Sequence, residues 1–189
     1  LTFPALASLL SSYAHEFFCA GGFRGAAATV DSAEFRKYAP ERTVDIQHIV
    51  IDVTPNFRER SLAATTTLRF KPIGNDVTEV RLNAEDLRIE KVISKEAKLA
   101  AHHSTDSELV ITYAGALPAD VEQQLTVTYT AFPQKGLYFR TREMGYKAED
   151  EHLFTQGEDI EARHWFPCFD APNEKFTSEV ICHVPAEMT

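Results

Sequence analysis

The sequence of 189 residues has few cysteines and no long apolar run, and each shortage excludes a class of protein. Its three cysteines, Cys19, Cys168 and Cys182, cannot all pair with one another, so a secreted disulfide scaffold is not expected. Free thiols are typical of a reducing compartment, which favours a cytoplasmic location. No apolar run reaches the roughly 18 residues of a spanning helix, so no membrane span is expected.

Basic residues are outnumbered as well. The 19 Lys and Arg against 28 Asp and Glu give a formal net charge of −9. Nucleic-acid binding depends on Lys and Arg that neutralise phosphates, so this balance argues against a nucleic-acid partner. The same charge argues against binding to an anionic membrane surface.

The sequence also lacks the common catalytic motifs. It contains no phosphate-binding glycine loop, no G-x-S-x-G element and no H-E-x-x-H zinc motif. His102 and His103 are neighbours, and neighbours on a strand point to opposite faces. His164 and Cys168 have helical spacing, but Pro167 between them disfavours a helix. We therefore expect no metal site and no cofactor in this chain alone.

Residues 1–38 are predicted to be an extension of the main domain. One face of a helix would collect apolar side chains there, and a glycine-rich stretch, GGFRGAAA, follows. The segment is expected to be a short docking helix or a partly disordered segment. A truncated signal peptide is less favoured, because no basic residues precede the apolar ones. The apolar face consists of Leu6, Leu9, Leu10, Tyr13 and Phe17.

From Thr43 onward the apolar residues recur with a period of two, which predicts strands. The clearest runs are 43–54, 63–71, 107–113 and 123–131, and shorter ones lie at 77–82, 86–93, 137–140 and 177–184. In the first run the apolar side switches near His48, which indicates a bulge or a strand covered on both faces. Turn residues such as Gly115 and Pro118 separate the runs. Residues 39–189 are therefore expected to form one all-β domain, an antiparallel sandwich or open barrel.

The stretch TQGEDIEARHWFPCFDAP, residues 155–172, follows most of these strands and has no clean period. Trp165, Phe166 and Phe169 flank a proline and are expected to anchor a loop against the sandwich edge. From 148 to 162 the chain has six acids and no Lys or Arg. On charge alone this region is either a solvated acidic loop or a negative rim that attracts a cation.

The same stretch closely resembles the end of the N-terminal domain of the zinc aminopeptidases that include aminopeptidase N. The pattern T-Q-x-(E/Q)-x-x-x-A-R-x-x-F-P-C-x-D-x-P-x-x-K is matched throughout, and Ala171 and Ser178 depart from common choices of that family. The upstream GLYFRT and the strand-rich region from about residue 42 are also similar. The matched residues are Thr155, Gln156, Glu158, Ala162, Arg163, Phe166, Pro167, Cys168, Asp170, Pro172 and Lys175.

The resemblance implies a saddle-shaped β-sandwich that belongs to a peptidase removing amino-terminal residues. Zinc would be bound by the next domain, whose H-E-x-x-H, further Glu ligand, catalytic Tyr and G-x-M-E-N segment are absent from these 189 residues. The chain by itself is therefore expected to be inactive. Its partners would be a peptide amino terminus and the catalytic domain of the same protein.

The resemblance also assigns roles. Glu158 would bind the α-ammonium of the substrate, and Gln156 would line the pocket for the first side chain. The peptide bond between Glu158 and Asp159 is expected to be cis. Arg163, Phe166, Pro167, Cys168, Asp170, Pro172 and Lys175 would be structural, with Arg163 and Asp170 paired beneath the loop and Cys168 a packed thiol.

Two other classes remain open at this point. One is a non-catalytic relative that uses the sandwich as an interaction or scaffold module. The other is a self-standing sandwich that binds carbohydrate or protein, with the acidic loop merely solvated. A domain that docks on a catalytic partner should also show an exposed apolar patch when it is separated from that partner.

Overall fold

The structure, a computed structural model, describes residues 41–186 and residue 188. The predicted N-terminal helix lies outside the described residues. None of the helices in the described part has the length and hydropathy needed to cross a bilayer.

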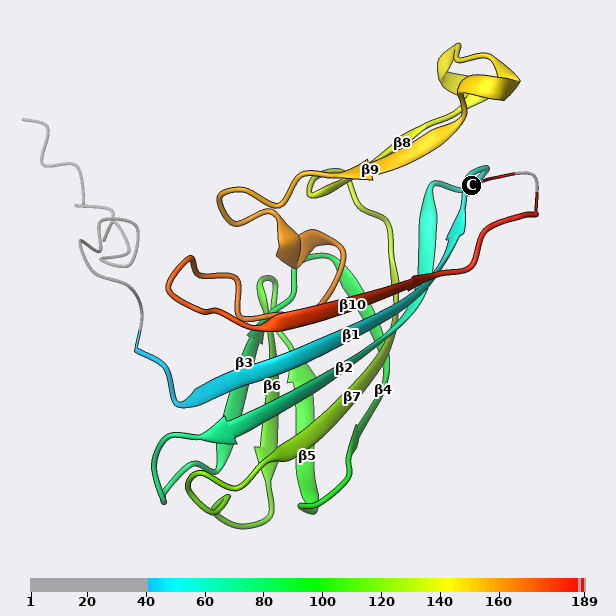
Figure 1. Cartoon of the computed structure of the whole chain (residues 1–189). Helices are drawn as coiled ribbons and strands as arrows, with labels where there is room; N and C mark the ends of the chain where they lie inside the picture. Colours follow the sequence, from blue (N-terminus) through cyan, green and yellow to red (C-terminus); the bar gives the residue numbers. More distant parts are fainter. Residues whose placement is uncertain (1–40, 187, 189) are drawn as a thin grey trace, which may run out of the picture. The chain divides into compact units, whose positions relative to one another are not determined.

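Strands dominate the described part, which confirms the all-β prediction (Figure 1). A five-stranded sheet has the order β10-β1-β2-β7-β4, a three-stranded sheet has the order β3-β6-β5, and β8 pairs with β9. Three short 3-10 helices lie in the C-terminal part: η1 (Arg142–Met144), η2 (Ala148–Asp150) and η3 (Ala162–His164). The strands are β1 (Val44–Asn56), β2 (Ser61–Pro72), β3 (Glu79–Asn83), β4 (Leu87–Ser94), β5 (Leu99–Ser104), β6 (Glu108–Tyr113), β7 (Gln123–Ala131), β8 (Leu137–Arg140), β9 (His152–Thr155) and β10 (Thr177–Cys182).

The two larger sheets enclose one hydrophobic core. Alternation places every second side chain of β2 and β7 inward, as the sequence pattern predicts. This core includes Leu68 of β2, Val127 of β7, Leu82 of β3 and Ile111 of β6, each at most 1% exposed. The alternating sequence pattern therefore correctly predicts which faces of β2 and β7 are buried.

The bulge predicted near His48 is present in β1. The register between β1 and β2 shifts between Ile46 and His48. Ile46 and Ile49 are both buried although they are three residues apart. The extra residue returns the apolar positions after His48 to the core side, which explains the switch in the sequence pattern.

One strand pair departs from the antiparallel expectation. β10 runs parallel to β1 and forms the edge of the five-stranded sheet, in red in Figure 1. A parallel pair needs a long connection, and here the whole of β2 to β9 lies between the two strands. All six residues of β10 are exposed, with Val180 at 56% and Ile181 at 37%. Two large apolar side chains are thus exposed on this edge strand.

β8 and β9 form a hairpin that extends away from the larger sheets, with η1 and η2 at its tip (Figure 1). Neither β9 nor β5 was among the predicted strands. Five of the six residues of β5 are exposed, and β9 has only four residues, so neither has the buried alternation that marks a strand in sequence.

Candidate functional site

The candidate site is the loop of residues 156–161, which connects β9 to η3. Its first residue, Gln156, donates its backbone N–H to the carbonyl of Gly136 at 2.9 Å. Its last residue, Glu161, donates its backbone N–H to the carbonyl of Gly157 at 3.0 Å, which closes the loop on itself. The peptide bond between Glu158 and Asp159 is cis, which confirms the expectation drawn from the resemblance.

Gln156 and Glu158 both lie on this loop and both are exposed. The carboxylate of Glu158 enters none of the ion pairs among the described residues, whereas Glu161 pairs with Lys135 and His164. The Glu158 side chain is therefore neither inside the sandwich nor neutralised by the described part of the chain. It can accept a cationic group from outside.

The predicted pair beneath the loop is confirmed. Arg163 Nε donates to Asp170 Oδ2 at 3.0 Å, and the Arg163 backbone N–H donates to the same oxygen at 3.2 Å. Arg163 Nη2 also donates to the Asp170 carbonyl at 3.2 Å. The two side chains are only 17% and 10% exposed. This pair joins η3, where the loop ends, to the segment seven residues further along.

The rest of the motif attaches this region to β3. Trp165 and Phe166 are buried and Phe169 is partly buried against the core, as expected of an anchor. Pro167 and Cys168 between them are buried as well. Cys168 and Asn83 exchange two backbone hydrogen bonds, of 2.7 and 3.1 Å. Burial raises the pKa of the Cys168 thiol well above its ordinary value, which agrees with a packed thiol.

The last two motif residues, Pro172 and Lys175, are exposed and lie outside this anchor. The structure therefore does not bring them to the loop that carries Gln156 and Glu158.

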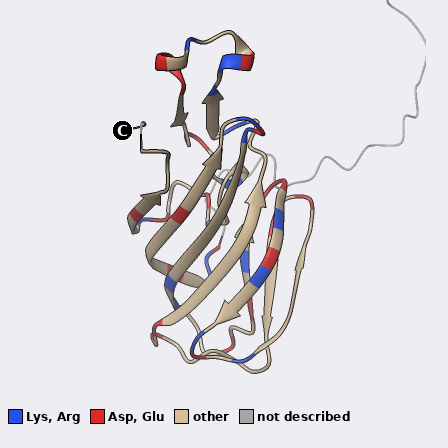
Figure 2. Cartoon of the chain, turned by 90° about the vertical axis from the view of Figure 1, so that its right-hand side faces the viewer, with Lys and Arg blue, Asp and Glu red and all other residues tan. Residues whose placement is uncertain are grey.

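The six acids between 148 and 162 do not form one rim. Glu149, Asp150 and Glu151 are at the hairpin tip, and the other three follow β9 at its opposite end. Figure 2 shows that the tip also carries basic residues. Glu151 is neutralised there by Arg142, whose Nε lies 3.2 Å from Glu151 Oε2. The acidic composition therefore divides into a solvated tip and the candidate loop.

Glu174 is a buried carboxylate that sequence reasoning missed. Its side chain is 0% exposed, and it accepts hydrogen bonds from Arg42 Nη1 and from the Ile46 backbone N–H, the latter at 3.1 Å. The hydrogen bond from Arg42 to Glu174 and the negative charge of Glu174 raise the pKa of Arg42. No sequence signal identifies the pair, because its members are 132 residues apart. The Arg42–Glu174 pair links the start of β1 to the turn before β10.

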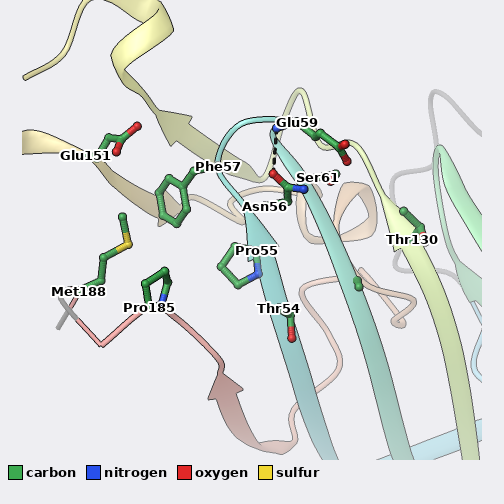
Figure 3. Close-up of a pocket in the computed structure, with 11 residues that line it drawn as sticks. Thr54, Pro55, Asn56, Phe57, Glu59, Ser61, Thr130, Glu151, Pro185 and Met188 are labelled. Atoms are coloured by element: carbon green, nitrogen blue, oxygen red, sulfur yellow. Dashed lines mark hydrogen bonds between the residues drawn. The ribbon is translucent and has the colours of Figure 1, made fainter. Parts of the chain in front are cut away.

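A pocket of about 610 Å³ lies near the turn between β1 and β2 (Figure 3). Phe57 and Pro55 line it together with Pro185 and Met188 from the C-terminal segment. Its polar lining includes Glu151. None of the predicted site residues is part of it, so it does not belong to the candidate loop.

The resemblance implies zinc in the next domain, and the described residues of this chain do not provide a zinc site. Among residues 41–186 and 188, no three His, Cys, Asp or Glu side chains come together in a way that could hold a metal ion. His48 and His183 instead contact β10 and β1 partners, with ring nitrogens 2.7 Å from Thr177 Oγ1 and 2.9 Å from Asp52 Oδ1.

Comparison with known proteins agrees with this fold. The model of the Peptidase M1 N-terminal domain family matches residues 38–189. The chain belongs to this family.

Its curated relatives are peptidases and a related hydrolase. Leukotriene A-4 hydrolase from Xenopus laevis is 26% identical over 162 residues, which cover 82% of this chain. Aminopeptidase M1-D from Oryza sativa subsp. japonica is 32% identical over 114 residues, or 57% of this chain. The chain spans only 27% and 13% of the lengths of these two relatives.

Solved structures share the fold. Yeast LTA4 hydrolase in complex with bestatin matches with a TM-score of 0.63 at 21% identity, over 82% of this chain and 27% of that one. An M1 zinc metallopeptidase from Deinococcus radiodurans matches with a TM-score of 0.62 at 19% identity, over 78% of this chain and 34% of that one.

Proposed function

We propose that this chain is the N-terminal domain of a zinc aminopeptidase and that Glu158 binds the α-ammonium of the peptide substrate. The observation that carries the proposal is the exposed carboxylate of Glu158, which no described cation neutralises, on a loop that hydrogen bonds hold at both ends. Gln156, on the same loop, lines the pocket for the first side chain. The zinc and the groups that act on the scissile bond belong to a catalytic domain outside these residues.

The chemistry of the reaction calls for such a carboxylate. An aminopeptidase has to hold the free amino terminus one residue from the bond that it cleaves. Hydrogen bonds between a carboxylate and an ammonium group are short and contribute roughly 1.5–3 kcal/mol each. A neutral group in place of Glu158 would discriminate less between a free amino terminus and an internal peptide position.

The test is kinetic and uses the parent enzyme, which contains the catalytic domain. Glu158→Gln and Glu158→Ala should raise KM for an aminoacyl anilide by about 10- to 100-fold, because each hydrogen bond to a charged group contributes roughly 1.5–3 kcal/mol. The change should fall mainly on KM, since the ammonium is bound alike in the ground state and the transition state. Unaltered KM in both variants would remove the assignment.

The 189-residue chain assayed alone is expected to leave the same anilide uncleaved. Peptide hydrolysis that persists through purification and a metal chelator would contradict the division of labour between the two domains.

A further inference from the structure

The acid three residues after Glu158 has a different environment. Glu161 is the last residue of the loop, and its side chain is 27% exposed. Its Oε1 lies 3.7 Å from Lys135 Nζ, and its Oε2 lies 3.5 Å from His164 Nε2. The Oε2 atom is buried and accepts no hydrogen bond from the described residues. Each carboxylate oxygen therefore faces a different basic side chain.

These two basic side chains come from separate elements. Lys135 precedes β8, and His164 belongs to η3. His164 is itself held in place: it is 11% exposed, and its Nδ1 lies 4.0 Å from Glu85 Oε1. The backbone N–H of Glu85 also donates to the carbonyl of Arg163 at 3.0 Å. The Glu161 carboxylate thus connects the hairpin base to the segment anchored on β3.

The backbone of Glu161 is fixed at the same place. A Cβ on Gly136 would lie 1.9 Å from the Glu161 carbonyl oxygen. The backbone of the loop therefore packs against Gly136 too closely for any side chain at that position. The Gly136 carbonyl in turn accepts the Gln156 N–H. Because Glu161 also bonds back to Gly157, a displacement of Glu161 would move the residues between them, including Glu158.

We propose that Glu161 is a positioning residue, held by Lys135 and His164, which fixes the loop so that Glu158 meets the substrate ammonium. This inference rests on the proposed function of Glu158. It separates the acids of the loop into one that binds substrate and one that holds the first in place.

The kinetic test uses Glu161→Gln in the parent enzyme. The variant keeps the shape of the side chain and removes its charge, and KM for an aminoacyl anilide should rise about fivefold with kcat nearly unchanged, as expected for loss of one partly exposed ion pair. Asp159→Asn is the matched control, because it removes an exposed charge from the same loop. An equal rise in KM for Asp159→Asn would mean a general loss of negative charge and would overturn the inference.

A double-mutant cycle then asks whether Glu161 acts through Glu158. In a Glu158→Ala background, Glu161→Gln should change KM by less than about twofold. A full fivefold rise in that background would show independent action and overturn the inference. If Glu158→Ala raises KM but Glu161→Gln does not, the proposed function stands and only this inference fails.

A second readout does not depend on activity. Hydrogen exchange at the Glu161 amide, which donates to Gly157, should accelerate in Glu161→Gln and stay unchanged in Asp159→Asn. Unchanged exchange in both variants would overturn the positioning role even if Glu158 binds substrate as proposed. If Glu158→Ala leaves KM unaltered, the proposed function fails, and accelerated exchange in Glu161→Gln would show that the loop contact itself is real.

Discussion

Arg163 and Asp170 form a pair that is largely shielded from solvent, with Arg163 Nε 3.0 Å from Asp170 Oδ2 and the Arg163 backbone N–H donating to the same oxygen. The pair closes the turn between η3 and the segment that approaches β3. Asp170 is held on its other side by its backbone N–H, which donates to Asn83 Oδ1 at 3.0 Å. Asp170 thus connects the base of the candidate loop, through its carboxylate, to the sandwich, through its backbone N–H.

The first prediction concerns the stability of this pair. Asp170→Asn should lower the free energy of unfolding by about 2–3 kcal/mol, because it leaves a shielded guanidinium without its counter-ion. Arg163→Met should cost a similar amount. The double variant should lose less than the sum of the two, with a coupling energy of at least about 1 kcal/mol by urea unfolding. Additive losses would show that the two side chains do not interact energetically.

The second prediction uses two glycines with positive φ. Gly136 has φ 72° and Gly145 has φ 92°, but only Gly136 leaves no room for a Cβ, which would meet backbone atoms of Glu161. Gly145→Ala should cost about 1 kcal/mol, from the left-handed backbone alone. Gly136→Ala should cost at least about 1 kcal/mol more and should also displace the loop.

Urea unfolding of both alanine variants checks this difference, and amide chemical shifts of residues 156–161 follow the loop. Equal costs, with the shifts unchanged in Gly136→Ala, would show that the contact with Glu161 does not constrain the loop.

Most of the sandwich was predictable from the sequence because burial of alternate side chains is a local signal. The bulge at His48 was visible for the same reason, since an extra residue changes which positions are apolar. The parallel pairing of β10 was not, because an exposed edge strand carries no pattern that distinguishes its direction. The pairing of Glu174 with Arg42 was hidden as well, because it joins distant parts of the chain.

The candidate site divides in the same way. Gln156, Glu158 and the Arg163–Asp170 pair were found through the spacing of a family motif rather than through periodicity. The role of Glu161 depends on distances to Lys135 and His164, which only the folded chain reveals. By residue type alone, Glu161 cannot be distinguished from the other five acids between 148 and 162.

The third prediction concerns thiol reactivity. Cys168 is 1% exposed and burial raises its pKa, whereas Cys182 is exposed on β10, although partial burial also raises its pKa. Since the thiolate is the reactive form, iodoacetamide near pH 8 should alkylate Cys182 in the native chain and leave Cys168 unmodified. Raising the pH should speed the reaction of Cys182. Peptide mass spectrometry follows each site, and both should react in concentrated guanidinium chloride. Native labelling of Cys168 would contradict its place in the core.

The last prediction is a loss of stability at alkaline pH. Burial raises the pKa of Tyr113 from 10.0 to about 12, and burial also raises the pKa of Tyr129. A pKa that is higher in the folded state favours the neutral form there, so the stabilisation is complete below pH 10. It is lost as the pH rises from 10 toward 12, because the unfolded chain ionises first.

The free energy of unfolding should therefore fall in this interval, by up to about 1.4 kcal/mol per pH unit for each tyrosine. Tyr113→Phe removes one of these groups and should reduce the slope by up to that amount, which urea titrations at pH 10, 11 and 12 would measure for both proteins. Other groups that ionise in this interval contribute equally to the two chains and cancel in the comparison. Identical slopes would mean that the Tyr113 hydroxyl titrates alike in the folded and unfolded states and would contradict the raised pKa expected from its 4% exposure.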